Sequence, residues 1–346
     1  MTIIINQADL DRDGSRIVTA LKSFLTPRSD GRRFQWLYKE NPFGLARTWI
    51  ATHGDEEAVV GVASAFPRRV YAGSTEATGW VLGDFCIASE YRTLGPALQL
   101  QRCLLQEVQS EAIPFFYDFP SASMMAVFRR LNISQTGECV RLAKLLRVNR
   151  KVMAVVKNPL IGKVLCLTGN MMLRVQAGGS PPQNGYTLSL HEQPCGEEFS
   201  ALTREIGGRY GVCVERTAQY LNWRYFDNPL ERYEIFTARA DGRLRGFIVF
   251  TQAGEDAQVV DLAGCQEAKL LETLIGGCVD LLRTRGVGTV QASMLSSHPL
   301  IGTWERQGFR RREAVPFVAI AAPAHRSHFD PRYGAVWALM HGDRDS

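Results

Sequence analysis

The stretch WLYKENP, residues 36–42, recurs far downstream as WRYFDNP, residues 223–229. The copies lie 187 positions apart and share tryptophan, tyrosine, asparagine and proline at the same offsets, with an acidic residue before the asparagine. Such agreement raises the question of whether the rest of the chain is also written twice.

The segments that follow the two copies have the same predicted order. A strand hairpin comes first, then a strand, a long helix, a strand and a short helix. After the first copy these segments are 47–73, 80–89, 90–111, 113–120 and 121–132. After the second copy they are 233–252, 257–264, 268–286, 287–295 and 296–309. A helix over residues 15–25 opens the chain.

This correspondence predicts a duplicated domain, because its period is too long for a solenoid. The expected fold class is α/β (α+β), with two tandem copies of one fold. The expected boundaries are 1–145 for the first domain, 146–185 for a basic and apolar linker, 186–325 for the second domain and 326–346 for a tail.

Length and composition agree with two ordinary globular domains. The chain has 346 residues, of which 45% are hydrophobic and 22% charged, and about 150 residues per domain is usual. Lysine and arginine outnumber the acids by 40 to 35. That balance could attract an anionic cofactor, but it is no signature of nucleic-acid binding.

The cysteines and the apolar segments indicate a cytoplasmic protein. The eight cysteines are scattered without a C-x-x-C pair, which argues against a zinc site or a disulfide framework. The N-terminus lacks the basic start and long apolar run of a secretory signal. The most apolar long segment, 152–173, is interrupted by Lys157, Pro159 and Lys163 and is not expected to span a bilayer.

The sharpest chemical signal is RTLGPA, residues 92–97, at a predicted strand-to-helix junction. Exposed amides and the dipole at a helix N-terminus favour a phosphate group. Gly95 would let the backbone approach closely, and Arg92 would add charge. The alternative is a capped helix start with a surface arginine.

The order of elements, the strand DFCI at 84–87 and the R-x-x-G-x-A pattern at 92–97 resemble the GNAT acyltransferase superfamily. The family's L-G-F ending is kept as Gln307-Gly308-Phe309 and reads Leu131-Asn132-Ile133 in the first half. The resemblance covers both halves, with more specific motifs in the first.

The resemblance implies, for each half, a mixed twisted sheet flanked by helices, and acetyl-CoA or another acyl-CoA in a V-shaped gap of the first sheet. No metal is implied. The residues expected to bind the cofactor are Ile87, Arg92, Thr93, Leu94, Gly95, Ala97 and Leu98. Pro96 departs from the usual pattern because it lacks an amide hydrogen. The second half has GCQEAK at 264–269, where Glu267 would repel phosphates, so one acyl-CoA per chain is expected.

The proton-handling residues are less defined. The family's usual tyrosine, four residues before the final glycine, is replaced by Phe128 and, in the second half, by Trp304. Tyr117 and Asp118, at the expected mouth of the gap, are candidate acids or bases, or else polar residues at a strand end. Asp84 is a further candidate base, but its recurrence as Asp261 favours a structural role.

Three residues are candidates for contact with the acceptor. Trp36 and Tyr38 either pack the segment before the first hairpin or form aromatic walls for an acceptor such as a sugar. Ser121 either contacts substrate or caps a helix, and capping is favoured. His325 and His328 are expected to be solvated in the tail.

The leading prediction is an acyl-CoA-dependent acyltransferase, an N-acetyltransferase that transfers directly to an amine. Tandem chains with a similar R-x-L-G-P-A-L segment are associated with bacterial envelope polysaccharides, so an amino sugar or lipid-linked saccharide is an expected acceptor. The alternatives are a non-catalytic acyl-CoA-binding or scaffold protein and a relative of the aminoacyl-tRNA-dependent transferases.

The linker suggests a further partner. Its basic residues surround an apolar stretch, as in a helix that lies on a membrane surface; they are Arg147, Arg150, Lys151, Lys157, Lys163 and Arg174. The alternative is a helix packed between two globules. The expected location is cytoplasmic, with peripheral membrane contact under the first reading. The oligomeric state and the acyl length stay open.

Overall fold

In the computed structural model, which describes residues 3–54, 58–92, 94–156, 158–176 and 185–344, the two tryptophan motifs have the same local structure. Each is a π-helical turn that continues a one-turn α-helix. The first pair is α2 (Gly31–Phe34) and η1 (Gln35–Lys39), and the second is α8 (Ala218–Leu221) and η3 (Asn222–Phe226). The duplication is therefore structural as well as sequential.

The two turns meet between the halves of the molecule. The rings of Trp36 and Trp223 stack with centroids 5.2 Å apart. The Trp36 Nε1 donates to the Trp223 carbonyl oxygen at 2.7 Å, and the Trp223 Nε1 donates to the Trp36 carbonyl oxygen at 2.9 Å. This reciprocal pair relates the halves by approximate two-fold symmetry.

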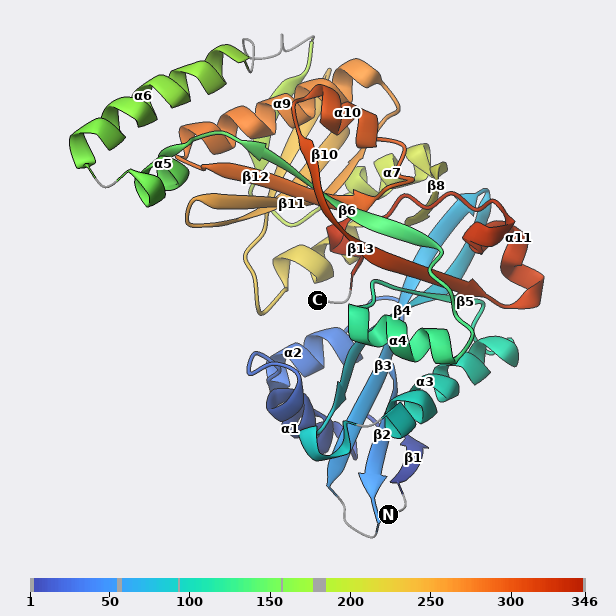
Figure 1. Cartoon of the computed structure of the whole chain (residues 1–346). Helices are drawn as coiled ribbons and strands as arrows, with labels where there is room; N and C mark the ends of the chain where they lie inside the picture. The colour runs from blue at the N-terminus through green and yellow to red at the C-terminus, as the bar shows by residue number, and fades with distance from the viewer. Residues whose placement is uncertain (1–2, 55–57, 93, 157, 177–184, 345–346) are drawn as a thin grey trace.

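The remaining elements follow the predicted order in both halves (Figure 1). The first half adds α1 (Gly14–Phe24), α3 (Leu94–Gln109), α4 (Ala122–Arg130), the 3-10 turn η2 (Ser89–Tyr91), β1 (Ile3–Gln7), β2 (Arg47–His53), β3 (Val59–Gly73), β4 (Thr75–Ile87), β5 (Phe115–Asp118) and β6 (Gly137–Leu145). The middle segment forms α5 (Asn149–Val155) and α6 (Pro159–Gln176). The second half adds β7 (Thr187–His191), α7 (Glu197–Ile206), β8 (Gly208–Val214), β9 (Glu234–Ala240), β10 (Arg243–Ala253), β11 (Asp256–Gly264), α9 (Ala268–Thr284), β12 (Thr289–Leu295), α10 (Ile301–Arg306) and β13 (Arg310–Ala321).

The halves exchange their last strands, which the sequence did not predict. The described strands form one sheet in the order β1-β2-β3-β4-β5-β13-β6-β12-β11-β10-β9-β7, with β8 paired to β3. Thus β13 of the second half pairs with β5 of the first, and β6 pairs with β12. Among the pairs of described strands, β4–β5 and β11–β12 are parallel and the others are antiparallel. The predicted boundaries at 145 and 186 therefore divide the sequence but not the sheet.

Helices cover both faces of the first half-sheet. Ile17 and Leu21 of α1 join a core cluster that continues through the second half. Leu100 and Leu104 of α3, with Phe128 of α4, belong to a second cluster on the other face. Apolar residues at i, i+4 spacing in α3 supply this face, as expected of an amphipathic helix on a sheet.

The short helices α4 and α10 end in the same way. The amide of Ile133 donates to the Phe128 carbonyl at 2.9 Å, and the amide of Phe309 donates to the Trp304 carbonyl at 3.1 Å. Asn132 and Gly308 both have positive φ angles, 59° and 83°. Asparagine is the common substitute for glycine in this left-handed conformation, which explains how Leu131-Asn132-Ile133 replaces the family's ending.

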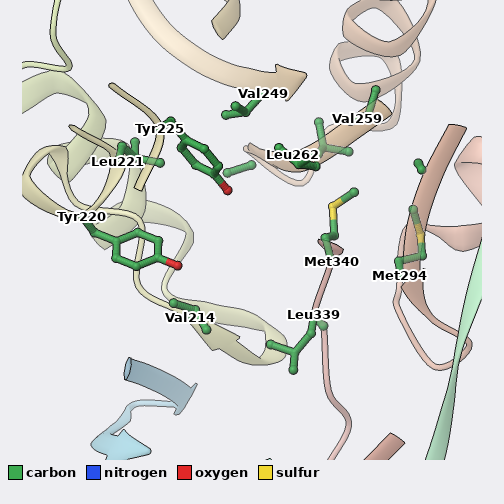
Figure 2. Packing of buried hydrophobic residues seen from close by; sticks show 14 of the residues in the cluster. Val214, Tyr220, Leu221, Tyr225, Val249, Val259, Leu262, Met294, Leu339 and Met340 are labelled. Atoms are coloured by element: carbon green, nitrogen blue, oxygen red, sulfur yellow. The ribbon is translucent and has the colours of Figure 1, made fainter. Parts of the chain in front are cut away.

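The residues predicted as a tail are packed into the molecule. They form the short helix α11 (Arg326–Phe329) and the 3-10 turns η5 (Pro331–Tyr333) and η6 (His341–Asp343). The 3-10 turn η4 (Pro323–His325), at the end of the predicted second domain, comes directly before them. Trp337, Leu339 and Met340 are buried, and Figure 2 shows Leu339 and Met340 among side chains of the second half. The described part of the predicted tail therefore contributes to the core. Of the two histidines expected to be solvated, His328 is exposed and His325 is half-buried.

Candidate functional site

The site begins where β4 and β5 separate. These parallel strands pair at only two positions, Trp80 with Phe116 and Val81 with Tyr117. Beyond them the strands diverge, and a cavity of about 620 Å³ lies between the end of β4 and the residues that follow β5. It is lined by Phe24, Ser64, Leu82, Gly83, Phe85, Cys86, Ile87, Arg92, Ala97, Gln101, Asp118, Phe119, Pro120, Ser121, Ser123, Met124 and Val127. The resemblance to the GNAT superfamily implied a cofactor gap in this part of the first half.

Asp84 lies in a bulge of β4 and faces away from the cavity. The β3–β4 register shifts between Val62 and Ser64, and Asp84 takes a φ of 47°. Its carboxylate accepts hydrogen bonds from Arg33 at 2.6 and 2.8 Å and from the Tyr38 hydroxyl at 2.7 Å. Asp84 does not line the cavity. Its candidate role as a base is therefore replaced by a structural one.

The second half repeats this buried arrangement. Asp261 accepts hydrogen bonds from Arg216 Nε at 2.9 Å and from the Tyr225 hydroxyl at 2.9 Å. A tyrosine from the π-helical turn therefore bonds to a strand aspartate in each half, and an arginine neutralises the aspartate. Buried carboxylates need such partners because an unpaired buried charge is strongly unfavourable.

The N-terminal end of α3 borders the cavity. Ile87, Arg92 and Ala97 are among its lining residues, and Arg92 Nε donates to the Ile87 carbonyl oxygen at 3.1 Å. Gly95 is exposed in the first turn of the helix. The helix N-terminus and the guanidinium together favour an anion at this end.

The other predicted cofactor residues lie nearby or in the core. Leu98 packs against the hydrophobic cluster beneath α3 rather than lining the cavity. Leu94 is the first residue of α3. Thr93 lies outside the described residues.

Polar side chains gather on the β5 side of the cavity. Asp118 is the one carboxylate among the lining residues that the structure describes. Ser121 caps α4 by accepting from the Met124 amide at 3.2 Å, and its hydroxyl lies 2.9 Å from that of Ser123. Ser121 thus caps the helix and lines the cavity at once, so both of its predicted roles are open to it.

The cavity's thiol is not set up as a nucleophile. Burial raises the pKa of Cys86 to about 12, and Asp84 adds to the effect. A thiol with this pKa is protonated at neutral pH and reacts slowly. Any group transfer in the cavity is therefore expected to proceed without a cysteine intermediate.

Tyr117 is turned away from the cavity. It is completely buried, and its hydroxyl donates to the Asp343 carbonyl oxygen at 2.9 Å. Burial raises its pKa well above the ordinary value. Successive side chains of a strand point to opposite faces, so Asp118 reaches the cavity and Tyr117 does not. The candidate role of Tyr117 as a general acid does not fit this placement.

Trp36 and Tyr38 also lie outside the cavity. Trp36 is buried against Trp223, and Tyr38 is buried between Asp84 and Ser64. Burial and then the nearby Asp84 raise the pKa of Tyr38 well above its ordinary value. Neither ring is available as a wall for an acceptor, and the packing alternative holds for both.

Two buried polar residues of the cavity, Ser64 and Gln101, were not among the sequence candidates. Ser64 is a buried hydroxyl in the apolar run of β3, and Gln101 is a buried amide on α3. Gln101 is one helical turn from Ala97 and therefore shares its face. Both Ser64 and Gln101 are polar residues on an otherwise apolar face of a strand or helix, and this pattern could have identified them in the sequence.

In the second half, the C-terminal segment occupies the corresponding gap. The β11 and β12 strands pair in parallel up to Val259 and Ala292. Beyond them, Met340 bridges to Met294 of β12, and a Cβ on Gly342 would lie 3.1 Å from the Val260 carbonyl of β11. Figure 2 shows Met340 between Leu262 and Met294.

The second half also lacks an anion cradle. Glu267 accepts hydrogen bonds from Arg245 at 2.9 Å and from the Tyr186 hydroxyl at 2.6 Å. Glu267, a carboxylate neutralised by Arg245, thus stands just before α9. In the alignment of the two halves it takes the place of Gly95. The occupied gap and the acidic helix start both favour one site per chain, in the first half.

Comparisons with known proteins show the fold. No protein-family model matches the sequence, and no curated protein matches it either. Several solved structures, in contrast, have a similar fold. A probable N-acyltransferase of Enterococcus faecalis is 11% identical, with a TM-score of 0.66 over 93% of this chain and 73% of that one. A GCN5-related N-acetyltransferase of Anabaena variabilis is 14% identical, with a TM-score of 0.66 over 93% and 74%.

A third match is itself built from two halves of this kind. Saccharomyces cerevisiae N-myristoyltransferase, solved with bound myristoyl-CoA, is 11% identical, with a TM-score of 0.58 over 93% of this chain and 79% of that one. Each of the three matches covers 93% of this chain and therefore includes parts of both halves. The chain therefore has the tandem fold of the GNAT N-acetyltransferases and of N-myristoyltransferase.

Proposed function

We propose that the chain is an acyl-CoA-dependent N-acyltransferase with one active site, in the first half. The observation that carries the proposal is the cavity between the diverging β4 and β5, bordered by the N-terminus of α3 and Arg92. In this fold, one structurally similar protein holds myristoyl-CoA, and others are described as N-acyl- or N-acetyltransferases.

The cavity has the surfaces that an acyl-CoA needs. At one end, the first turn of α3 and Arg92 offer amides and positive charge for a diphosphate. Apolar side chains, among them Leu82, Phe85 and Met124, line the space where the pantetheine arm and acyl group would lie. Acetyl-CoA is the simplest donor, and the volume of about 620 Å³ also accommodates longer acyl groups.

Transfer is proposed to be direct. The acceptor nitrogen forms a bond to the thioester carbonyl carbon, the C–S bond breaks, and coenzyme A leaves as a thiolate. The thiolate takes one proton from water, which balances the proton that the amine loses. Asp118 is positioned to take the proton that the amine loses. Phe128 is buried where the family's usual tyrosine stands, so the protein offers no phenol there for the leaving thiolate.

The acceptor is proposed to be a hydroxylated amine, such as an amino sugar of an envelope saccharide precursor. The hydroxyls of Ser121 and Ser123 and the carboxylate of Asp118 stand together on one side of the cavity. These groups suit an acceptor that carries both an amine and hydroxyls. A non-catalytic acyl-CoA-binding protein and a relative of the aminoacyl-tRNA-dependent transferases are the competing functions.

The donor site is tested by the variant Gly95→Glu. Its carboxylate would stand at the diphosphate end, and we expect acyl-CoA to bind roughly tenfold or more weakly, as if about 1.4 kcal/mol were lost. Calorimetric titration with acetyl-CoA, octanoyl-CoA and myristoyl-CoA measures this. Folding should not suffer, because glutamate suits the first turn of a helix better than glycine.

The matched control for this experiment is Gln106→Glu, which adds the same charge to an exposed position later in α3. Affinity should be unchanged in the control. The proposal fails if the wild-type protein binds none of the three donors, or if Gly95→Glu binds them as the wild type does.

Catalysis is tested by Asp118→Asn. We expect release of free thiol from acyl-CoA, in the presence of an amino-sugar panel, to fall on the order of 100-fold, while donor affinity stays unchanged. Asp227→Asn makes the same chemical change at an exposed residue of the second half and should be neutral. Donor binding without thiol release on any acceptor would instead identify a binding-only protein, and equal rates in both variants would remove Asp118 from the mechanism.

A further inference from the structure

Helix α6 carries its large apolar side chains on the outside. In Figure 1 it lies at one edge of the molecule, beside α5 and outside the sheet. Leu160 is 74% exposed and Leu167 is 72% exposed. The other exposed apolar residues of this helix are Ile161, Val164, Leu165, Met171 and Met172. A helix on a protein surface normally shows the opposite pattern.

The inward face of α6 is small and polar. Gly162 and Cys166 are buried, and a Cβ on Gly169 would lie 2.7 Å from Val148. Asn170 accepts from the Val148 amide at 2.9 Å and donates to the Asn149 side chain at 2.7 Å. These contacts fix the rotation of the helix, so the apolar side chains are held outward.

The exposed apolar face of α5 and α6 is much larger than the single exposed apolar residues that occur on most protein surfaces. The described residues contain sixteen large apolar side chains that are exposed, and nine of them belong to α5 and α6. Contiguous patches of this kind mark protein or membrane contacts. No helix among the described residues is long and apolar enough to cross a bilayer, so any membrane contact would lie along the surface.

The charge of this segment favours a membrane over a protein as the partner. Residues 146–185 contain six basic residues and no aspartate or glutamate. Lys163 is exposed beside the apolar face, and Arg147 and Arg150 lie near the start of α5. Lys157 lies outside the described residues, as do the side chains of Lys151 and Arg174. An apolar face in an acid-free basic segment complements a surface that is apolar inside and anionic outside.

We infer that α6 docks the protein on an anionic lipid bilayer, with Leu160, Val164, Leu167 and Met171 inserted among the acyl chains. These four residues lie at i, i+4, i+7 and i+11 and so form one stripe. Lys163 lies within one turn of them and meets the headgroups. Arg150 of α5 pairs with Asp256 of the second half at 2.7 Å, and no residue of α5 or α6 is among the described residues that line the cavity, so the binding surface is separate from it.

Vesicle co-sedimentation tests the inference. The full chain is mixed with vesicles of phosphatidylcholine alone or of phosphatidylcholine with phosphatidylglycerol, at low and high salt. We expect binding to the anionic vesicles that weakens with salt, and little binding to the neutral ones. In the double variant Leu167→Glu with Met171→Glu, partitioning should fall at least roughly tenfold, since two apolar side chains that would enter the bilayer are lost.

The matched control is Leu45→Glu with Val336→Glu, which makes the same change at two exposed apolar residues elsewhere. It should bind vesicles as the wild type does. Both pairs are exposed, so equal thermal melting of the two variants shows that folding is intact.

Three results would overturn the inference: no binding to either vesicle, binding that ignores phosphatidylglycerol, or equal binding by the α6 variant. A fourth such result could come from sedimentation velocity of the protein without vesicles. A concentration-dependent dimer that the α6 variant abolishes would show that a second copy of the chain covers this face instead.

Discussion

Replacing Arg216 with methionine is expected to lower the free energy of unfolding by about 3–5 kcal/mol. Arg216 is buried and binds two buried carboxylates, Asp261 at 2.9 Å and Asp343 at 2.8 Å. Methionine fills much of the volume but leaves both charges without a cation in a medium of low polarity. Urea unfolding at neutral pH, followed by circular dichroism, measures the change.

The same variant should lose its defect in acid. Burial raises the pKa of Asp343 even with Arg216 present, and the pKa should rise further without the guanidinium. A carboxyl with a raised folded pKa penalises folding above its unfolded pKa and stops doing so below it. The difference between variant and wild type should therefore shrink as pH falls from neutral toward the ordinary aspartate pKa of about 4, and this contribution should be gone below it.

Arg239→Met provides the control for this prediction. Arg239 pairs with Glu198 at a partly exposed site, where an ion pair contributes about 0–1 kcal/mol. A loss below about 1 kcal/mol for Arg216→Met as well would contradict the prediction. It would mean that water or a rearranged C-terminal segment solvates the two aspartates.

Local sequence signals predicted most of the helices and strands. The hairpins, the helix that follows RTLGPA and the end of α4 depend on turn residues and on periodicities within a few positions. Together with the family resemblance, these signals led to a candidate site that includes Arg92 and Asp118, both of which line the cavity. The alignment of the two halves also paired Phe128 with Trp304. Each of these features is encoded by residues close together in the chain.

The same local signals could not predict which strands pair between the two halves. The apolar pattern of β6 and of β13 specifies a strand but not its neighbour, so the exchange between halves could not be read from it. The C-terminal segment looked like a tail because its turn formers outweigh its few apolar residues. Tyr117 differs from Asp118 only in strand phase, and the phase depends on which face the other half covers.

Replacing Trp36 with alanine is expected to lower the free energy of unfolding by about 3–5 kcal/mol. The change removes the stack on Trp223 and the hydrogen bond to its carbonyl oxygen. It also opens a cavity between the halves, where Arg224 lies 5.7 Å from the Trp36 ring centroid. Denaturant unfolding of the full chain measures the loss.

The symmetry of the pair supplies the control. Trp36→Phe keeps an aromatic ring for the stack but removes the Nε1 donor, and Trp223→Phe does the same on the other side. Because the two bonds are reciprocal, both variants should lose similar amounts, about 1–2 kcal/mol, and less than Trp36→Ala. A full-sized loss for one phenylalanine variant and none for the other would show that the motif stabilises only its own half. Similar losses would mean that WLYKENP and WRYFDNP hold the duplicated halves together through one shared contact.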